Sequence, residues 1–212
     1  MGQPWVPIVV GIAGGTGAGK SWLADRLDEN LAGRTTRLRE DWYYRDRSCL
    51  TEDEALFVNF DHPSAIDAAR LLRDLIALSH GTTIGAPQYD YATHRRTPAT
   101  MRVRPNSVVL IEGLFVLYRP ELRDRIDVGV FIDVPAEVRL ERRIQRDLHS
   151  RHIPEKETIR LWENFVCPMH DRFIEPSARH AHHIWRPDRD PAFPHRLATS
   201  ILERLNTAAA KR

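Results

Sequence analysis

Residues 14–21 constrain the fold of this 212-residue chain more strongly than any other stretch, because they match the phosphate-binding pattern G-x-x-x-x-G-K-[ST]. An apolar run at 6–12 precedes them, and a helix-compatible segment at 21–31 follows. Glycines let such a loop turn so that consecutive backbone N–H groups point at phosphate oxygens, and the following helix adds its positive end. A plain glycine-rich turn is the alternative, but the flanking strand and helix favour nucleotide binding.

The match to the P-loop pattern predicts which residues contact the nucleotide phosphates and the metal. Lys20 is expected to reach the β- and γ-phosphates, and the Ser21 hydroxyl is expected to ligate Mg²⁺. The predicted nucleotide-binding residues of the loop are Gly14, Gly15, Thr16, Gly17, Ala18, Gly19, Lys20 and Ser21.

Apolar runs alternate with helix-compatible segments along the rest of the chain, which predicts an α/β fold of the P-loop nucleoside triphosphate hydrolase type, a parallel sheet flanked by helices. The predicted strands are 6–12, 35–38, 108–113, 128–134 and 184–185. The predicted helices are 21–31, a short one beginning near 51, 63–79, 136–151, 154–175 and 192–209. We expect a single domain over residues 1–212, with a β-hairpin excursion near 82–104 that turns at Gly85 and Pro87, and a helical lid near 136–160.

The composition excludes several classes of protein. The net charge of +2, from 31 basic and 29 acidic residues, argues against a nucleic-acid-binding protein held by phosphate contacts. Cys49 and Cys167 form no CxxC pattern, so a disulfide framework is not indicated. No window approaches the ~20 apolar residues of a membrane span, and no signal peptide is evident. We therefore expect a cytoplasmic protein with neither a membrane nor a nucleic acid as partner.

Two acidic residues follow predicted strands, at the sheet edge where ligands bind in open α/β folds. Glu112 ends the run 108–111 and is the candidate for a second metal ligand, directly or through water. Asp41 follows the strand at 35–38 and is a candidate general base that also contacts a metal-bound water. The alternatives are an ordinary strand-end carboxylate for Glu112 and an Asx-turn for Asp41.

A basic stripe lies on the predicted helix 136–151. Four arginines fall within one third of its circumference, and apolar residues occupy the opposite side. Such a stripe is either a solvated face or, beside a nucleotide site, a lid that closes over phosphates. Asp147 is spaced to pair with Arg143. The four arginines are Arg139, Arg142, Arg143 and Arg146, and the apolar residues are Val138, Leu140, Ile144 and Leu148.

Several motifs together resemble the uridine kinase (uridine–cytidine kinase) family, within the phosphoribulokinase/uridine kinase group of P-loop proteins. The resemblance covers nearly the whole chain. Its most specific parts are the N-F-D-H-P segment at 59–63 and the tyrosine–histidine hairpin at 89–95. The other parts are the P-loop, Asp41 with Tyr44, the I-E-G segment at 111–113, the arginine segment 139–147 and the F-I-E-P segment at 173–176.

The resemblance implies transfer of the γ-phosphoryl group of ATP or GTP to the 5′-hydroxyl of uridine or cytidine, with Mg²⁺ as the metal. Asp41 is then the base, and Lys20 and Arg143 share in catalysis. Arg143, Arg146 and Arg151 match the family's lid arginines, the last two as nucleotide ligands. The family also tends to form tetramers, which implies a homo-oligomer.

The resemblance further implies a nucleoside pocket. Asp61 would hold the ribose 2′- and 3′-hydroxyls, while Tyr89 and His94 would contact the pyrimidine edge. Tyr91 and Phe60 would pack on the ring, and Tyr44 belongs to the same substrate site.

The lid departs from the family pattern, because His152 and Ile153 stand where the family usually has a Gly-Arg pair. One phosphate-contacting arginine is therefore absent, and Arg142 or Arg139 is its candidate substitute. Leu161 replaces a residue that is often polar, and Trp42 and Tyr43 replace a less aromatic pair. Two alternatives to a nucleoside kinase remain: a related kinase with another hydroxyl acceptor, such as a sugar phosphate or pantothenate, or a nucleotide-sensing module without catalysis.

Overall fold

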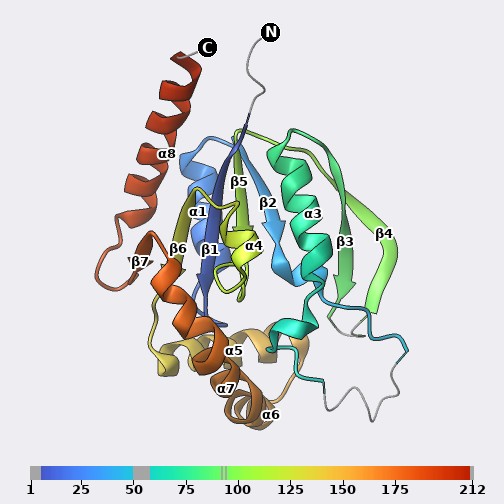
Figure 1. Ribbon diagram of the computed structural model, residues 1–212. Coiled ribbons are helices and arrows are strands. Elements are labelled where there is room, and N and C mark those ends of the chain that lie inside the picture. Colours follow the sequence, from blue (N-terminus) through green and yellow to red (C-terminus); the bar gives the residue numbers. More distant parts are fainter. Residues whose placement is uncertain (1–5, 50–57, 92, 94, 211–212) are drawn as a thin grey trace.

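A five-stranded parallel sheet forms the centre of the computed structural model, which describes residues 6–49, 58–91, 93 and 95–210 (Figure 1). The strand order is β2 (Thr35–Arg39), β5 (Val108–Glu112), β1 (Ile8–Gly14), β6 (Val128–Ile132) and β7 (His183–Trp185). Every residue of β5 and β6 is buried, as expected of parallel strands covered on both faces. The predicted fold class is confirmed.

Two apolar clusters cover the two faces of the sheet. On one face α1 (Lys20–Asn30) and α8 (Phe193–Ala210) pack with Leu23 and Leu27 against Leu197. On the other face lie α3 (Ala68–Ser79) and α4 (Pro120–Arg123). None of the described helices is both long and apolar enough to cross a membrane.

The hairpin consists of β3 (Ile84–Asp90) and β4 (Arg95–Val103), an antiparallel pair separate from the central sheet. The prediction that Gly85 and Pro87 form its turn is wrong. Both residues lie inside β3, opposite Arg102 and Thr100, and the chain reverses between β3 and β4. A two-stranded sheet tolerates Pro87 because the proline needs no ladder hydrogen bond on an edge, and the register shifts just after it.

The predicted helix 63–79 is two elements. Pro63–Ala65 forms a 3₁₀ turn, and α3 begins only at Ala68. Between them Ile66 forms a β-bridge with Tyr44, and the Asp67 carboxylate accepts the Arg70 N–H at 3.2 Å as the cap of α3. A cap and a tertiary bridge therefore override the helical periodicity. The short helix predicted near 51 lies outside the described residues.

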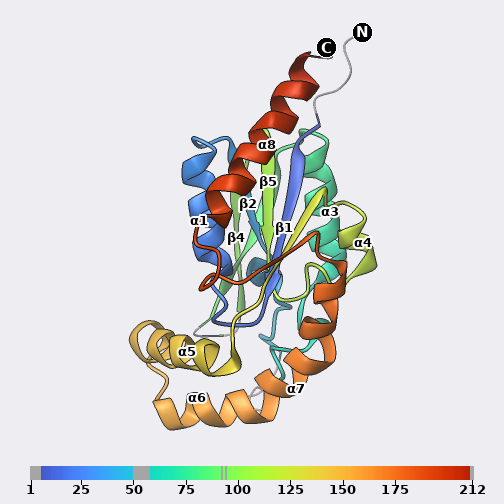
Figure 2. The same ribbon diagram turned by 90° about the vertical axis from the view of Figure 1, so that its left-hand side faces the viewer.

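The segment predicted as a lid, near 136–160, contains α5 (Ala136–Arg151) and most of α6 (Glu155–Leu161), which gather with α7 (Cys167–Met169) at the carboxyl end of the sheet (Figure 2). The predicted helix 154–175 is interrupted by π-helical turns at 162–166 and 170–174, and helical structure continues to His180. In α5 the buried residues are Arg139, Arg143 and Asp147, whereas Leu148 is 46% exposed. The polar stripe of α5 therefore faces the protein.

His152 closes α5 in the left-handed conformation, with φ of 56°. Glycine adopts this conformation without strain and is common after the last helical residue. His152 stands where the family resemblance leads us to expect glycine. The helix therefore ends at the expected place, but histidine must adopt a backbone conformation that is less favourable for it than for glycine.

Candidate active site

The P-loop runs from the end of β1 into α1, with Gly17 and Gly19 at φ of 76° and 98°. A Cβ on Gly17 would lie 2.4 Å from the carbonyl oxygen of Arg139, so only glycine fits under the lid helix. Lys20 Nζ donates to the carbonyl oxygens of Gly14 and Gly15, both at 3.0 Å. Burial lowers the pKa of Lys20, while the Asp41 and Glu112 carboxylates oppose this shift.

Ser21 and Glu112, two of the three residues predicted at the metal, lie together because β5 pairs in parallel with β1. The third, Asp41, follows β2, which is the strand next to β5. Ser21 Oγ donates to Glu112 Oε2 at 2.9 Å, and the Glu112 side chain is almost fully buried. A hydroxyl and a carboxylate are hard oxygen donors of the kind that Mg²⁺ prefers, so this pair fits the metal that the P-loop predicts.

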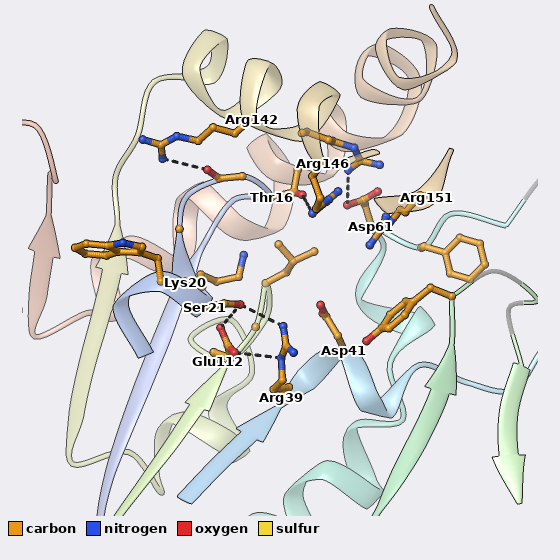
Figure 3. A pocket seen from close by; sticks show the side chains of 18 of the residues that line it. Thr16, Lys20, Ser21, Arg39, Asp41, Asp61, Glu112, Arg142, Arg146 and Arg151 are labelled. Carbon is orange, nitrogen blue, oxygen red and sulfur yellow. Dashed lines mark hydrogen bonds and ion pairs between the residues drawn. The ribbon is translucent and has the colours of Figure 1, made fainter. Parts of the chain in front are cut away.

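Two arginines that sequence reasoning missed also contact Glu112. Arg37 Nη2 lies 2.7 Å from Glu112 Oε1. Arg39 Nε lies 3.2 Å from the same oxygen, and Arg39 Nη2 donates to Ser21 Oγ at 3.3 Å (Figure 3). The available signal was their alternation with the buried Leu38, which places both arginines on one face of β2.

Asp41 projects into a 440 Å³ cavity from the 3₁₀ turn Glu40–Tyr43, which follows β2 (Figure 3). This cavity, called the phosphate cavity below, is bounded by the P-loop, Asp41, Glu112 and the lid arginines. The neighbouring Glu40 is fully buried and accepts the Phe115 N–H at 2.9 Å. Burial raises the pKa of Glu40 to about 7, with the hydrogen bond from Phe115 opposing.

A fully buried aspartate, Asp147, organises the lid arginines. Its carboxylate lies 3.2 Å from Arg143 Nε, 2.8 Å from Arg146 Nη2 and 3.6 Å from Arg151 Nη1, which confirms the predicted Arg143 pair. Arg146 also reaches Thr16 Oγ1 at 3.5 Å. Fixing the three guanidiniums on one carboxylate directs them towards the cavity that they line.

Arg139 and Arg142, the two candidate substitutes for the absent lid arginine, differ in position. Arg142 lines the phosphate cavity and donates to the Gly17 carbonyl at 3.3 Å. Arg139 is buried, stacks 5.3 Å from the Trp162 ring and donates to the Val134 carbonyl at 3.1 Å. The candidacy of Arg139 is therefore wrong, because its guanidinium packs behind the P-loop as part of the core.

A second cavity of 250 Å³ adjoins the first and is largely aromatic. The ring of Tyr44 lies 5.8 Å from Phe60 and 5.3 Å from Tyr89, and Tyr89 lies 5.4 Å from Tyr91. Tyr89 Oη is buried and has no hydrogen-bond partner among the described residues, which suits a polar group of a ligand. The predicted substrate residues described by the structure all line this cavity: Tyr44, Phe60, Asp61, Tyr89, Tyr91 and Arg143. His94 lies outside the described residues.

Asp61 stands where the two cavities meet and lines both. Burial raises its pKa, and the Arg143 guanidinium, whose Nη1 lies 3.9 Å from Asp61 Oδ1, opposes that rise. The apolar lid residues Ile153 and Leu161, both departures from the family pattern, line the far wall of the second cavity.

A third cavity, of 530 Å³, was missed by sequence reasoning. Trp22, 51% exposed, stacks on the buried Trp185 with the ring centroids 6.0 Å apart. Arg142, Pro187 and Pro191 complete the walls. The available signal in the sequence was Trp22, which directly follows the P-loop serine. A side chain as large as tryptophan cannot enter the core at this position.

Comparison with known proteins agrees with this architecture. A model of the Phosphoribulokinase / Uridine kinase family matches residues 9–190. A uridine kinase from Staphylococcus carnosus (strain TM300) is 40% identical over 174 residues, which cover 82% of this chain and 84% of that relative.

Two solved structures share the fold. A provisionally named fructose transport system kinase from Silicibacter sp. TM1040 aligns with a TM-score of 0.69 and 22% identity, covering 87% of this chain and 92% of that one. A phosphoribulokinase from Rhodobacter spheroides aligns with a TM-score of 0.63 and 11% identity, covering 87% and 71%. On its sequence match and its P-loop architecture, this chain belongs to the phosphoribulokinase/uridine kinase family of P-loop kinases.

Proposed function

We propose that this protein transfers the γ-phosphoryl group of ATP or GTP to the 5′-hydroxyl of uridine or cytidine. The observation that carries the proposal is the continuity of three cavities. The 440 Å³ cavity beside the P-loop (the phosphate cavity) shares Trp22 and Arg142 with the 530 Å³ cavity (the tryptophan cavity). It shares Asp61 and Arg143 with the 250 Å³ cavity (the aromatic cavity). The donor base would therefore bind in the tryptophan cavity, the triphosphate in the phosphate cavity and the planar acceptor base in the adjoining aromatic cavity.

On the donor side, stacking on Trp22 and Trp185 suits a nucleobase, and the P-loop amides suit its phosphates. Lys20 would exchange its contacts with the Gly14 and Gly15 carbonyls for the β- and γ-phosphates. Mg²⁺, when bound by Ser21 and Glu112, supplies positive charge to the same phosphate oxygens. Arg143, Arg146 and Arg151 are spaced along the lid to stabilise the charge on the transferred group.

On the acceptor side, the ionised Asp61 would accept two hydrogen bonds from the ribose 2′- and 3′-hydroxyls. Tyr91 and Phe60 would pack on the pyrimidine, and the unpartnered Tyr89 hydroxyl would bind its edge together with His94. Asp41 would accept the proton of the 5′-hydroxyl as it attacks the γ-phosphorus.

The charges of the aromatic cavity favour a nucleoside over a sugar phosphate. Arg143 and Arg151 are ion-paired with Asp147, and Arg160 is ion-paired with Glu157. In the described part of this cavity the three arginines are balanced by Asp147, Glu157 and Asp61, so an acceptor phosphate would meet no excess of positive charge. The tyrosine and phenylalanine rings of the cavity, in contrast, suit a base.

A coupled phosphorylation assay of the pure protein tests the proposal. Mg-ATP is supplied with uridine, cytidine, ribulose 5-phosphate or pantothenate, and 5′-deoxyuridine serves as the matched control because it lacks only the accepting hydroxyl. We expect turnover with uridine or cytidine and competitive inhibition without turnover by 5′-deoxyuridine. A preference for ribulose 5-phosphate or pantothenate would contradict the proposal that the acceptor is a nucleoside. Tight ATP binding without any turnover would favour a sensing module.

A further inference from the structure

Arg39 holds the same two oxygen groups that are expected to bind magnesium. Its guanidinium contacts Ser21 Oγ through Nη2 at 3.3 Å and Glu112 Oε1 through Nε at 3.2 Å, and Ser21 Oγ itself donates to Glu112 Oε2 (Figure 3). The β2–β5 register places Arg39 directly opposite Glu112. The contact is therefore built into the pairing of two central strands.

Arg37 contacts the same carboxylate but in a different setting. It is also ion-paired with Asp25 and donates to the Ser21 carbonyl oxygen at 3.4 Å, so its guanidinium is fixed on the outer side of the site. Arg39 is 42% exposed, lines the phosphate cavity beside Lys20 and Asp41, and has Glu112 as its only carboxylate partner among the described residues. Of the two arginines, Arg39 is the one that is free to move into the cavity.

We propose that Arg39 is a resident cation that competes with Mg²⁺ for Ser21 and Glu112. The inference rests on the proposed function, because it takes these residues as the ligands of the metal. Mg²⁺ requires oxygens at close range in near-ideal octahedral geometry, so Ser21 and Glu112 cannot serve the ion while they hold a guanidinium. Arginine keeps its charge at every accessible pH, so Arg39 leaves by movement and not by deprotonation.

The surrounding charges determine when that exchange is favourable. Lys20, Arg37 and Arg39 lie around Glu112 and offset its negative charge, so a divalent ion that arrives alone gains little from this carboxylate while Arg39 stays in place. A triphosphate brings the negative charge that compensates both the ion and the displaced guanidinium. The protein therefore takes up Mg²⁺ together with the nucleotide and binds the free ion poorly.

Direct binding of Mn²⁺ to the nucleotide-free protein, measured by electron paramagnetic resonance, tests this inference without any turnover. We expect Arg39→Gln to bind Mn²⁺ at least about tenfold more tightly than wild type, since one close positive charge is removed. Arg34→Gln removes the same charge just before β2 begins, at its opposite end, and should leave Mn²⁺ affinity unchanged. With ATP present, the difference between wild type and Arg39→Gln should shrink.

Two further variants separate the effect of the Arg39 charge from that of its forked geometry and locate the bound ion. Arg39→Lys keeps the charge on a side chain that cannot span Ser21 and Glu112 in a fork, so its Mn²⁺ affinity should lie between those of wild type and Arg39→Gln. Arg39→Gln combined with Glu112→Gln should lose the gain, which locates the ion at this carboxylate. Equal Mn²⁺ affinities for wild type, Arg39→Lys and Arg39→Gln would overturn the inference. Because no acceptor is present, this outcome is independent of whether the protein phosphorylates a nucleoside.

Discussion

On the donor side, one continuous segment, residues 14–21, supplies the loop whose backbone amides are expected to hold the phosphates, and side chains from β2, β5 and α5 complete the cavity around it. The acceptor pocket, in contrast, draws its walls from four separated segments: the turn at Tyr44, the loop at 60–61, the hairpin and the lid. The donor side combines backbone amides and cations with the Asp41 and Glu112 carboxylates. On the acceptor side, aromatic rings stand around Asp61, the most buried carboxylate among the described residues of that cavity. The phosphate-binding loop is therefore a local structure, whereas the walls of the aromatic cavity depend on how segments far apart in sequence come together.

Helix α5 belongs to both sides. Arg142 and Arg146 face the P-loop, with contacts to Gly17 and Thr16, while Arg143 and Arg151 line the acceptor pocket. Asp147 holds three of these four arginines, so the two sites share one buried ionic hub. Variants that affect one side and leave the other intact therefore test whether the sites are as separate as their construction indicates.

The largest effect is expected from Lys20→Ala on the donor side. Removing this cation should weaken ATP binding and lower turnover by more than about a thousandfold, because Lys20 is the P-loop side chain expected to reach the transferred phosphate. Turnover and ATP affinity are measured together, with the exposed Lys156→Ala as the control. A Lys20→Ala protein with full activity would contradict the P-loop assignment.

Asp41→Asn tests the point where the two sides meet. The substitution keeps the shape of the side chain but removes its ability to accept the 5′-hydroxyl proton, so turnover should fall at least about a hundredfold while ATP affinity stays nearly unchanged. Asp46→Asn, at an exposed aspartate five residues later, should retain turnover. Near-normal turnover of Asp41→Asn would remove this residue as the base.

Asp61→Asn should affect the acceptor side alone. Loss of two charge-assisted hydrogen bonds to the ribose should raise the KM for uridine about 10- to 100-fold and change the KM for ATP by less than about threefold. The 2′- and 3′-deoxynucleosides sharpen the test, because they should discriminate strongly for wild type and weakly for the variant. Equal losses for both substrates would make Asp61 a structural residue.

Trp22→Ala should affect the donor side in the complementary way. Loss of stacking on the donor base should raise the KM for ATP about five- to tenfold and leave the KM for the nucleoside unchanged. Trp22→Phe keeps an aromatic ring on Trp185 and should recover most of the affinity. If Trp22→Ala binds ATP as wild type does, the tryptophan cavity is not the base site.

The effect expected in the scaffold behind both sides is one of stability and not of activity. His170 is buried in the helical turn that follows α7, and burial lowers its pKa to about 4, against an ordinary value of 6.5. Its Nε2 lies 3.2 Å from the Glu175 carboxylate, a contact that a neutral ring makes as a donor. As the pH falls from about 6.5 to about 4, the unfolded chain takes up the proton first. This contribution to stability is therefore complete above pH 6.5 and is lost towards pH 4.

Urea unfolding across this pH range measures the effect. Wild type should lose about 2–3 kcal/mol that His170→Gln does not lose, because glutamine does not titrate. The exposed His149→Gln should follow the wild-type profile. Identical pH profiles for wild type and His170→Gln would show that His170 is protonated as easily in the folded state as in the unfolded one.

Local features were predictable because their causes are local. The glycine spacing of residues 14–21, the periodicity of α5 and the apolar run of β5 depend on neighbours within a few residues, and the structure has all three as expected. The side by side placement of Ser21 and Glu112 was also predictable, since parallel strands bring their carboxyl ends to one edge of the sheet. Where a competing contact came from a distant segment, prediction failed, as for the bridge between Ile66 and Tyr44 that delays α3.

By itself, the sequence determined that this chain has a P-loop, an α/β fold, a basic helix at 136–151 and the residue types expected of a nucleoside pocket. Only the tertiary structure decided which way the lid helix faces, that Asp147 holds its arginines, that Arg139 packs as core, and that Arg39 sits on the metal ligands. The physical reason is the range of the interactions. Glycine geometry and hydrophobic periodicity act along the chain, whereas an ion pair or a stacked ring depends on strand register and helix packing between residues far apart in sequence.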